Sequence, residues 1–162
     1  APLCASCVMQ KTCSAFSQNL VGQLPIKLKV IEKKKRYFDY FFFTVGDKIL
    51  IQKRDQGDIW ANLFQFYLVE QEKIMPETNI YINDILSNQL LIPSKNMVAQ
   101  SAAFIYKQQL THQELTVRFF KVVLTAIPEV FAKGNWVSKQ ALKKYAFPKT
   151  IISFLNEQGY LG

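Results

Sequence analysis

The chain has 162 residues, with 49% apolar side chains, 20% charged side chains and a formal net charge of +8 at pH 7. This length and composition indicate a globular chain with one main domain, and no apolar run approaches the roughly 18 residues of a membrane-spanning helix. The excess of Lys and Arg is unusual for an enzyme of small neutral metabolites and favours a polyanionic partner.

All three cysteines lie near the start of the chain, as Cys4, Cys7 and Cys13. The spacing Cys-x2-Cys-x5-Cys is typical of soft-metal ligation by converging thiolates. Such sites need four ligands, so either a fourth ligand lies elsewhere or the chain is part of a longer protein. Clustered cysteines without partners downstream also predict a reducing compartment, and the first residues do not resemble a secretory signal.

Residues 21–36 are predicted to form an extended basic linker, opposed in charge only by Glu32. Its cations are Lys27, Lys29, Lys33, Lys34, Lys35 and Arg36. Lysines in such a segment bind nucleic-acid phosphates independently of sequence, because each neutralised phosphate releases condensed counterions. The alternative is a solvated tether between two domains. A second basic group near the C-terminus includes Lys139, Lys143 and Lys144, which are expected to share one helix face and to contact phosphate or solvent.

The apolar pattern from residue 37 onward predicts strands interrupted by short helices. A hairpin is expected around the Gly46-Asp47 turn. Its strands are 37–45 and 48–53, and further strands are expected at 63–69, 102–110 and 115–125. Helices are expected at 76–86, from the N-cap Ser138 to Tyr145, and from Pro148 to Gln158, before the stop signal Gly159. This order predicts an α+β fold with a mixed sheet sandwich.

Four stretches, in the same order along the chain, resemble the A/G-specific adenine DNA glycosylases. They are PLCASCVMQKTCSA with the following LPIKLKV, then KILIQKRDQGDIWANLFQF, then Leu110-Thr111-His112, and finally Trp136-Val137 with Tyr145-Ala146-Phe147-Pro148. The resemblance covers most of the chain. It implies that residues 1–20 end the iron–sulfur loop of a missing catalytic domain, that 21–36 are the interdomain linker, and that 37–162 form a Nudix-like mixed β-sheet sandwich flanked by short helices.

The same resemblance implies a cofactor and partners. Four cysteines hold a [4Fe–4S] cluster in that family, and Cys4, Cys7 and Cys13 match the last three, so the chain by itself is not expected to hold the cluster. The parent protein is expected to excise adenine with residues of its absent N-terminal half, so no catalytic residue is expected here. The implied partners are double-stranded DNA with 8-oxoguanine:adenine mismatches and the catalytic domain, in the cytoplasm at the bacterial nucleoid, with no membrane.

The Nudix-like domain of the family reads 8-oxoguanine, so the polar tip between residues 110 and 114 is the candidate reader. 8-Oxoguanine carries an N7–H donor and a C8 carbonyl that guanine lacks. Thr111 and His112 can each donate or accept a hydrogen bond, Gln108 can hydrogen-bond, and Leu110 can wedge beside the base pair. The family commonly has a histidine at the position of Gln108 and an aromatic residue at that of Leu110. An ordinary hairpin turn is the alternative.

Two other functions remain open. A Nudix hydrolase of oxidised nucleotides needs a helix of clustered carboxylates that bind Mg²⁺, and the chain has neither an Arg-Glu nor a Glu-Glu pair. A protein-interaction module of a repair enzyme would instead present a contiguous apolar surface.

Overall fold

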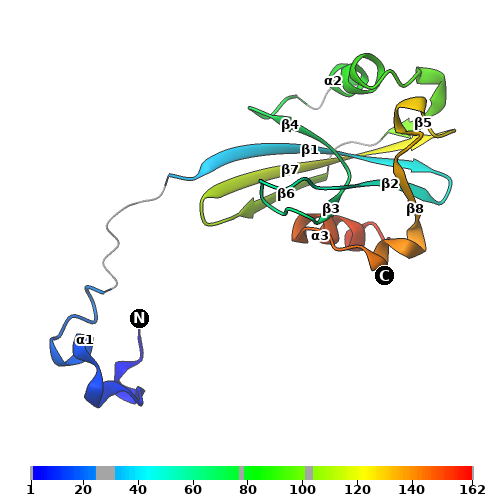
Figure 1. Cartoon of the computed structure of the whole chain (residues 1–162). Helices are drawn as coiled ribbons and strands as arrows, with labels where there is room; N and C mark the ends of the chain where they lie inside the picture. The colour runs from blue at the N-terminus through cyan, green and yellow to red at the C-terminus, as the bar shows by residue number, and fades with distance from the viewer. Residues whose placement is uncertain (1, 25–31, 77–78, 101–103, 162) are drawn as a thin grey trace. The chain divides into compact units, whose positions relative to one another are not determined.

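The computed structural model describes residues 2–24, 32–76, 79–100 and 104–161. The chain divides into two compact units, Ala1–Glu32 and Lys33–Gly162 (Figure 1). In its described residues the first unit contains short helical turns, which are η1 (Cys4–Ser6), η2 (Gln10–Thr12) and α1 (Ser14–Ser17). The second unit contains the sheet and both larger helices.

The strands of the second unit are β1 (Lys34–Val45), β2 (Lys48–Lys53), β3 (Phe64–Gln65), β4 (Tyr67–Gln71), β5 (Met97–Gln100), β6 (Phe104–Gln109), β7 (Gln113–Leu124) and β8 (Asn135–Ser138). Its helices are α2 (Asn79–Asn83), α3 (Lys149–Glu157), a π-helical turn η3 (Asp84–Gln89), and the 3₁₀ turns η4 (Ser94–Asn96), η5 (Glu129–Phe131) and η6 (Lys139–Lys144). No helix in the described ranges is long and apolar enough to cross a membrane.

Two long strands, β1 and β7, form the centre of the mixed sheet. They run parallel, from the pair Lys34 and Gln113 to the pair Thr44 and Val123. On one side of them β1 pairs antiparallel with β4 and β2, and β8 and β3 pair with β2. On the other side β7 pairs antiparallel with β6 along its first half and with β5 near its end. Parallel central strands are buried on both faces, and β1 is buried along most of its length.

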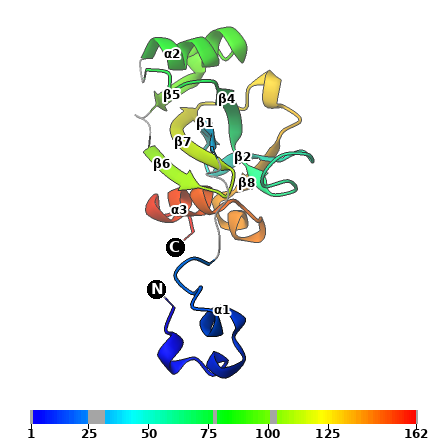
Figure 2. The ribbon, with the colours of Figure 1, turned by 90° about the vertical axis from the view of Figure 1, so that its left-hand side faces the viewer.

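The aromatic residues of β1 alternate between two hydrophobic cores, because successive side chains of a strand point to opposite faces. Phe38, Tyr40 and Phe42 belong to the core that α3 covers, where Phe119 of β7 stacks on Phe154 of α3 at 4.3 Å between ring centroids. Phe41 and Phe43 belong to the second core, which includes residues of α2 and η3. Figure 2 shows α2 and α3 on opposite sides of the sheet. The α+β class with a mixed sheet between short helices is therefore confirmed.

Several predicted elements are present with small changes. The hairpin turns at Gly46, whose φ of +57° suits glycine. Its first strand begins at Lys34, inside the segment predicted to be linker, because residues 34–36 pair with β7. The strand predicted at 63–69 is divided into β3 and β4 on either side of the buried Phe66. The final helix ends before Gly159, which has a φ of +70°.

Three elements differ from the expectations. Ser138 is an N-cap, since its Oγ accepts a hydrogen bond from the amide of Ala141 at 3.3 Å, but η6 is a 3₁₀ helix. Residues four or five apart do not align along a helix with three residues per turn, so the prediction that Lys139, Lys143 and Lys144 share one face is wrong. Strands β5 and β8 were not predicted, because each has only four residues.

Candidate functional site

The predicted reading tip is the connection between β6 and β7. Gln109 pairs with Glu114, and the amide of Leu110 donates to the carbonyl of Gln113 at 2.8 Å, so Leu110, Thr111 and His112 form a closed turn. Thr111 and His112 are exposed. Leu110 is half-buried and packs against the core that α3 covers, so its side chain also anchors the turn.

The basic start of β1 lies beside this tip. The main-chain N–H of Lys34 donates to the carbonyl of His112 at 3.0 Å, and Nζ of Lys33 donates to Oε1 of Gln109 at 3.3 Å. Lys34 and Lys35 are exposed. The structure therefore brings together two features that lie about 75 residues apart in sequence, the basic segment and the polar tip.

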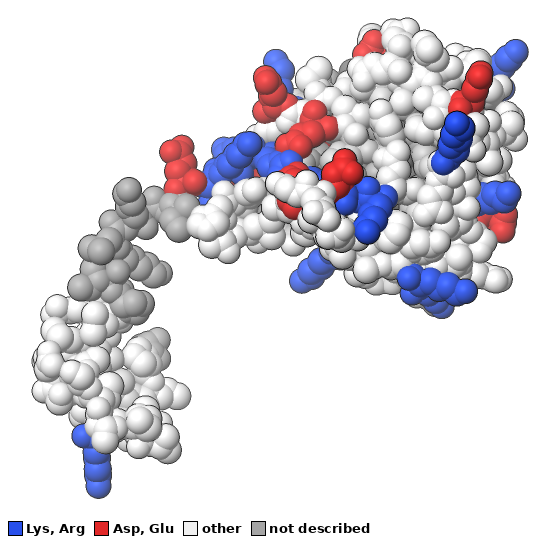
Figure 3. All heavy atoms as spheres, in the orientation of Figure 1, with Lys and Arg blue, Asp and Glu red and all other residues white. Residues whose placement is uncertain are grey.

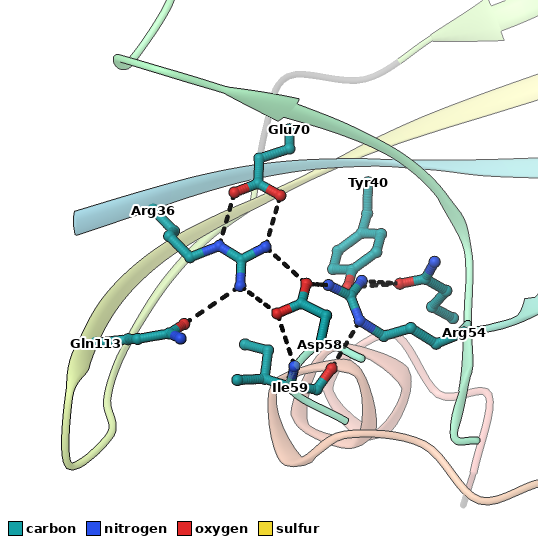
Figure 4. Close-up of polar contacts among 8 residues, drawn as sticks. Arg36, Tyr40, Arg54, Asp58, Ile59, Glu70 and Gln113 are labelled. Carbon is teal, nitrogen blue, oxygen red and sulfur yellow. Dashed lines mark hydrogen bonds and ion pairs between the residues drawn. The ribbon is translucent and has the colours of Figure 1, made fainter. Parts of the chain in front are cut away.

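Arg36 differs from the neighbouring lysines, because it is buried and paired within the protein. Its guanidinium donates to both carboxylate oxygens of Glu70 at 2.6 Å, to those of Asp58 at 2.6 and 2.7 Å, and to Oε1 of Gln113 at 3.3 Å (Figure 4). In Figure 3, Lys and Arg side chains gather where β1 begins, next to Asp and Glu side chains. Only 8% of Arg36 is exposed. Arg36 is therefore engaged within the protein, in contrast to the exposed Lys34 and Lys35 that precede it.

Asp58 connects Arg36 to a second arginine. Nη2 of Arg54 donates to Oδ2 of Asp58 at 2.5 Å, while its Nη1 donates to Gln65 at 2.6 Å and its Nε to the carbonyl of Ile59 at 2.7 Å. Hydrogen bonds from Arg36, with further ones from the Ile59 amide and Arg54, hold the pKa of Asp58 well below its usual range. Hydrogen bonds to Asp58 and Glu70 raise the pKa of Arg36.

These contacts hold the loop after β2 in a restrained conformation. Trp60 and Asn62 have φ values of +62° and +66°, which residues other than glycine seldom adopt. The loop is closed by hydrogen bonds between the main chains of Arg54 and Leu63 at 2.8 Å and of Asn62 and Arg54 at 3.2 Å. The sequence analysis missed this charged network. No local pattern indicated it, because Arg36 follows a run of lysines and Arg54 lies between Lys53 and Asp55.

The other candidate phosphate ligands are dispersed. Lys139 lies at the opposite end of β1 from the tip, since its amide donates to the carbonyl of Asp47 at 3.0 Å. Its Nζ lies 4.9 Å from the ring centroid of Tyr160. Lys143 is exposed in the last turn of η6. Lys27 and Lys29 fall outside the described residues.

Gln108 does not lie at the exposed tip itself. It is half-buried on β6 and lines a cavity between this strand and α3. Its Oε1 is buried and has no hydrogen-bond partner among the described residues. Gln108 is therefore positioned to contact something inside the cavity.

The three cysteines belong to the first unit and are free thiols. Cys7 is exposed, whereas Cys4 and Cys13 are half-buried. Within the part of the chain that the structure describes, no three His, Cys, Asp or Glu side chains come together as a metal site. These residues alone do not complete a four-thiolate centre.

An apolar surface lies at the other end of β7 from the tip. Exposed Leu91 and Val130 line a cavity of about 480 Å³ together with Pro93 and Pro128. The adjoining main chains meet where the amide of Thr125 donates to the carbonyl of Asn96 at 2.9 Å. This surface is separate from the tip and its lysines.

Comparisons with known proteins agree with this architecture. The chain is similar in structure to the DNA mismatch repair protein MutT, a Nudix hydrolase from methicillin-resistant Staphylococcus aureus 252, with 16% identity, a TM-score of 0.57, and coverage of 81% of this chain and 100% of that one. It is also similar to the C-terminal domain of mouse MUTYH, solved in complex with human PCNA, with 14% identity, a TM-score of 0.52, and coverage of 76% and 88%. Identities this low show the shared fold alone.

A sequence model of one family, described as the NUDIX domain, matches residues 40–157. The match begins within β1 and ends at the last residue of α3, so it includes the second half of β1, all of β7 and the tip. Of the charged network it includes Arg54, Asp58 and Glu70, whereas Arg36 precedes it. Since it spans well over half of the chain, this protein belongs to the NUDIX domain family.

Proposed function

We propose that the second unit recognises 8-oxoguanine opposite adenine in duplex DNA, as the lesion-reading domain of an adenine DNA glycosylase. The observation that carries the proposal is the hydrogen bond from the Lys34 amide to the His112 carbonyl. It holds two exposed polar side chains, Thr111 and His112, beside exposed lysines. Protein–DNA recognition combines base contacts, which discriminate, with phosphate contacts, which position the protein.

The chemistry of the tip suits a base with an altered hydrogen-bonding edge. The Thr111 hydroxyl accepts from the N7–H of 8-oxoguanine, whereas N7 of guanine offers only an acceptor. A hydroxyl can rotate to serve either base, so discrimination is expected to depend also on His112. One well-made base contact is worth about 1–3 kcal/mol of discrimination.

The glycosylase activity and the cofactor are proposed for a longer parent protein, on the resemblance of the cysteine segment and linker. Cys4, Cys7 and Cys13 would supply three thiolate ligands of a [4Fe–4S] cluster whose fourth ligand lies outside this sequence. The acid and the carboxylate that excise adenine would belong to the same missing domain. In this arrangement the present chain would determine which mismatch the catalytic domain acts on.

Hydrolysis of oxidised nucleotides is the second candidate, and membership of the NUDIX domain family favours it. Diphosphate hydrolysis in such enzymes needs carboxylates that converge on Mg²⁺. Among the residues described by the structure no such group of three is present. Lesion reading therefore accounts better for the residues at hand.

A binding experiment separates these functions. We would measure the affinity of the whole chain for duplexes that carry 8-oxoguanine or guanine opposite adenine, by fluorescence anisotropy. The reading hypothesis expects tighter binding to the 8-oxoguanine duplex. It expects Thr111→Val to weaken binding and His112→Ala to reduce the preference for 8-oxoguanine. Thr125→Val is the matched control, because Thr125 is exposed at the far end of β7.

Two outcomes would contradict the proposal. Equal affinity for both duplexes would show that the chain binds DNA without distinguishing 8-oxoguanine from guanine. Release of pyrophosphate or phosphate from 8-oxo-dGTP with Mg²⁺ would favour the hydrolase.

A further inference from the structure

A cavity of about 350 Å³ lies between β6 and the first turns of α3. Its polar lining comes from both elements, namely Lys107, Gln108, Gln109, Lys149, Thr150 and Ser153. No acidic residue is among the described residues that line it. Glu157, further along α3, accepts a hydrogen bond from the hydroxyl of Tyr106 at 2.5 Å. The cavity therefore has a polar wall with hydrogen-bond donors and, at Lys149, a cation.

Two buried polar atoms point to an occupant of this cavity. Across the described residues, Oε1 of Gln108 and Oγ1 of Thr150 are the two buried side-chain polar atoms that lack a hydrogen-bond partner. Both residues line this cavity, and only 6% of Thr150 is exposed. Buried polar groups in native proteins are satisfied by protein, water or ligand. A bound molecule that forms a hydrogen bond with each of these residues would give both atoms a partner.

The charges around the cavity favour an anion as the bound molecule. Helix α3 begins after Pro148, which provides no side-chain cap, and its first intrahelical hydrogen bonds start at Ile151. The amides of Lys149 and Thr150 precede those bonds, so the positive end of the helix dipole lies at the cavity. Lys149, the first residue of the helix, adds a cation beside these amides. The side chains of Lys107 and Gln109 alternate with those of Tyr106 and Gln108 along β6, so they point to the other face of the strand.

The two atoms that lack a hydrogen-bond partner are compatible with a bound anion. A hydroxyl can donate to an anion, which would pair Oγ1 of Thr150. A rotation of the Gln108 amide by half a turn exchanges its oxygen and nitrogen, and the hydrogen-bond partners present decide which orientation is adopted. In the rotated orientation a donor replaces the unpartnered acceptor. An anion thus satisfies both residues, and the amide rotates to meet it.

We propose that this cavity is a phosphate pocket, and that it takes a backbone phosphate of the DNA strand whose base meets the tip. Gln108 and Gln109 directly precede Leu110, so the pocket and the tip are built on one strand. The DNA source of the phosphate rests on the proposed function, whereas the phosphate chemistry does not. The pocket would fix the register of the strand while Thr111 and His112 read its base.

The test measures duplex affinity over a range of salt for the whole chain. Lys149→Gln is expected to weaken both the 8-oxoguanine and the guanine duplex by roughly tenfold, because it removes a charged hydrogen bond. It should also reduce the slope of log affinity against log salt by about one. Lys133→Gln is the matched control, since Lys133 is exposed next to β8 on the opposite side of the sheet.

Thr150 gives an uncharged test of the same pocket. Thr150→Val keeps the shape and removes the hydroxyl, so it should weaken both duplexes without changing the salt slope. Thr150→Ser keeps the hydroxyl and should restore binding. If Lys149→Gln behaves as Lys133→Gln does and Thr150→Val binds normally, the cavity holds only water and the proposal is overturned.

Two further comparisons separate the sources of the anion and the two proposals. The Thr150 amide resonance should move on titration with inorganic phosphate and again with duplex. A response to phosphate and none to duplex would overturn the DNA assignment. If both duplexes bind equally and the pocket variants still weaken them, lesion reading fails while the pocket stands. If the protein prefers 8-oxoguanine and the pocket variants bind normally, the pocket fails alone.

Discussion

Arg36 and Asp58 face each other through two hydrogen bonds, of 2.6 Å from Nη1 to Oδ1 and of 2.7 Å from Nη2 to Oδ2. This pair joins the start of β1, where the tip is anchored, to the restrained loop after β2. Arg36 is buried, whereas the Asp58 side chain is 38% exposed. The same guanidinium holds Glu70 of β4, so one arginine connects three segments of the chain.

Removal of the Asp58 charge is expected to destabilise the fold. Asp58→Asn removes a negative charge that faces two arginines, Arg36 and Arg54. The free energy of unfolding should therefore fall by about 2 kcal/mol. This is less than the cost for a fully buried pair, because Asp58 is partly exposed. Urea unfolding followed by circular dichroism measures the change. Asp55→Asn in the same exposed loop is the control. A change no larger than that of the control would contradict a structural role for the pair.

The pH dependence of stability should show the same network. The pKa of Asp58 is lowered in the folded protein, so its contribution is complete above the unfolded pKa and is lost as the pH falls below about 4. Stability should therefore decline in that range, and less steeply in Asp58→Asn. Urea midpoints measured from pH 7 to pH 2 test this. Parallel declines in both proteins would show that other carboxylates dominate.

Alkaline pH should also destabilise the protein. Burial raises the pKa of Tyr40, and burial with a hydrogen bond to Asp39 raises that of Tyr81. A tyrosine with a raised folded pKa contributes stability that is present below the unfolded pKa of about 10 and is lost above it. Tyr81→Phe should therefore flatten the decline of the unfolding free energy above about pH 10. An unchanged alkaline profile would contradict the assignment to Tyr81.

The buried pair between Asp39 and Arg118 is expected to matter most for stability. Arg118 donates to both oxygens of Asp39 at 2.6 Å, and both side chains are almost inaccessible. Asp39→Asn should cost about 3–5 kcal/mol because it leaves a buried guanidinium without its counter-ion. The double variant Asp39→Leu with Arg118→Met should be more stable than the single variant. If the single variant unfolds as the native protein does, the pair is not a determinant of stability.

Gly134 is required by close packing and not by its φ angle. A Cβ at this position would lie 2.7 Å from Cδ1 of Leu50 and 2.9 Å from the carbonyl of Phe131, which also accepts from Trp136. Gly134→Ala should lower the unfolding free energy by about 1–3 kcal/mol. Gly22→Ala, where a Cβ meets nothing within 4 Å, is the control. Equal melting temperatures for the two variants would contradict the packing argument.

Elements that depend on neighbouring residues were predictable from the sequence. The Gly46 turn, the Ser138 N-cap and the stop at Gly159 each rest on the dihedral angle or side chain of a residue at that position. The tip between β6 and β7 was located for the same reason, since a short polar segment separates two apolar runs. The basic character of residues 33–35 was also evident, because charge is a property of composition.

Only the tertiary structure decided which of these features meet. The parallel pairing of β1 with β7 joins residues about 80 positions apart, and no local pattern encodes such a register. That pairing buries Arg36 and leaves Lys34 and Lys35 exposed, although all three belong to one basic run. The packing of α3 beside β6 likewise brings Gln108 and Thr150 to one cavity. Sequence sets what each residue can do chemically, whereas long-range strand pairing determines which residues are buried, paired or free to bind.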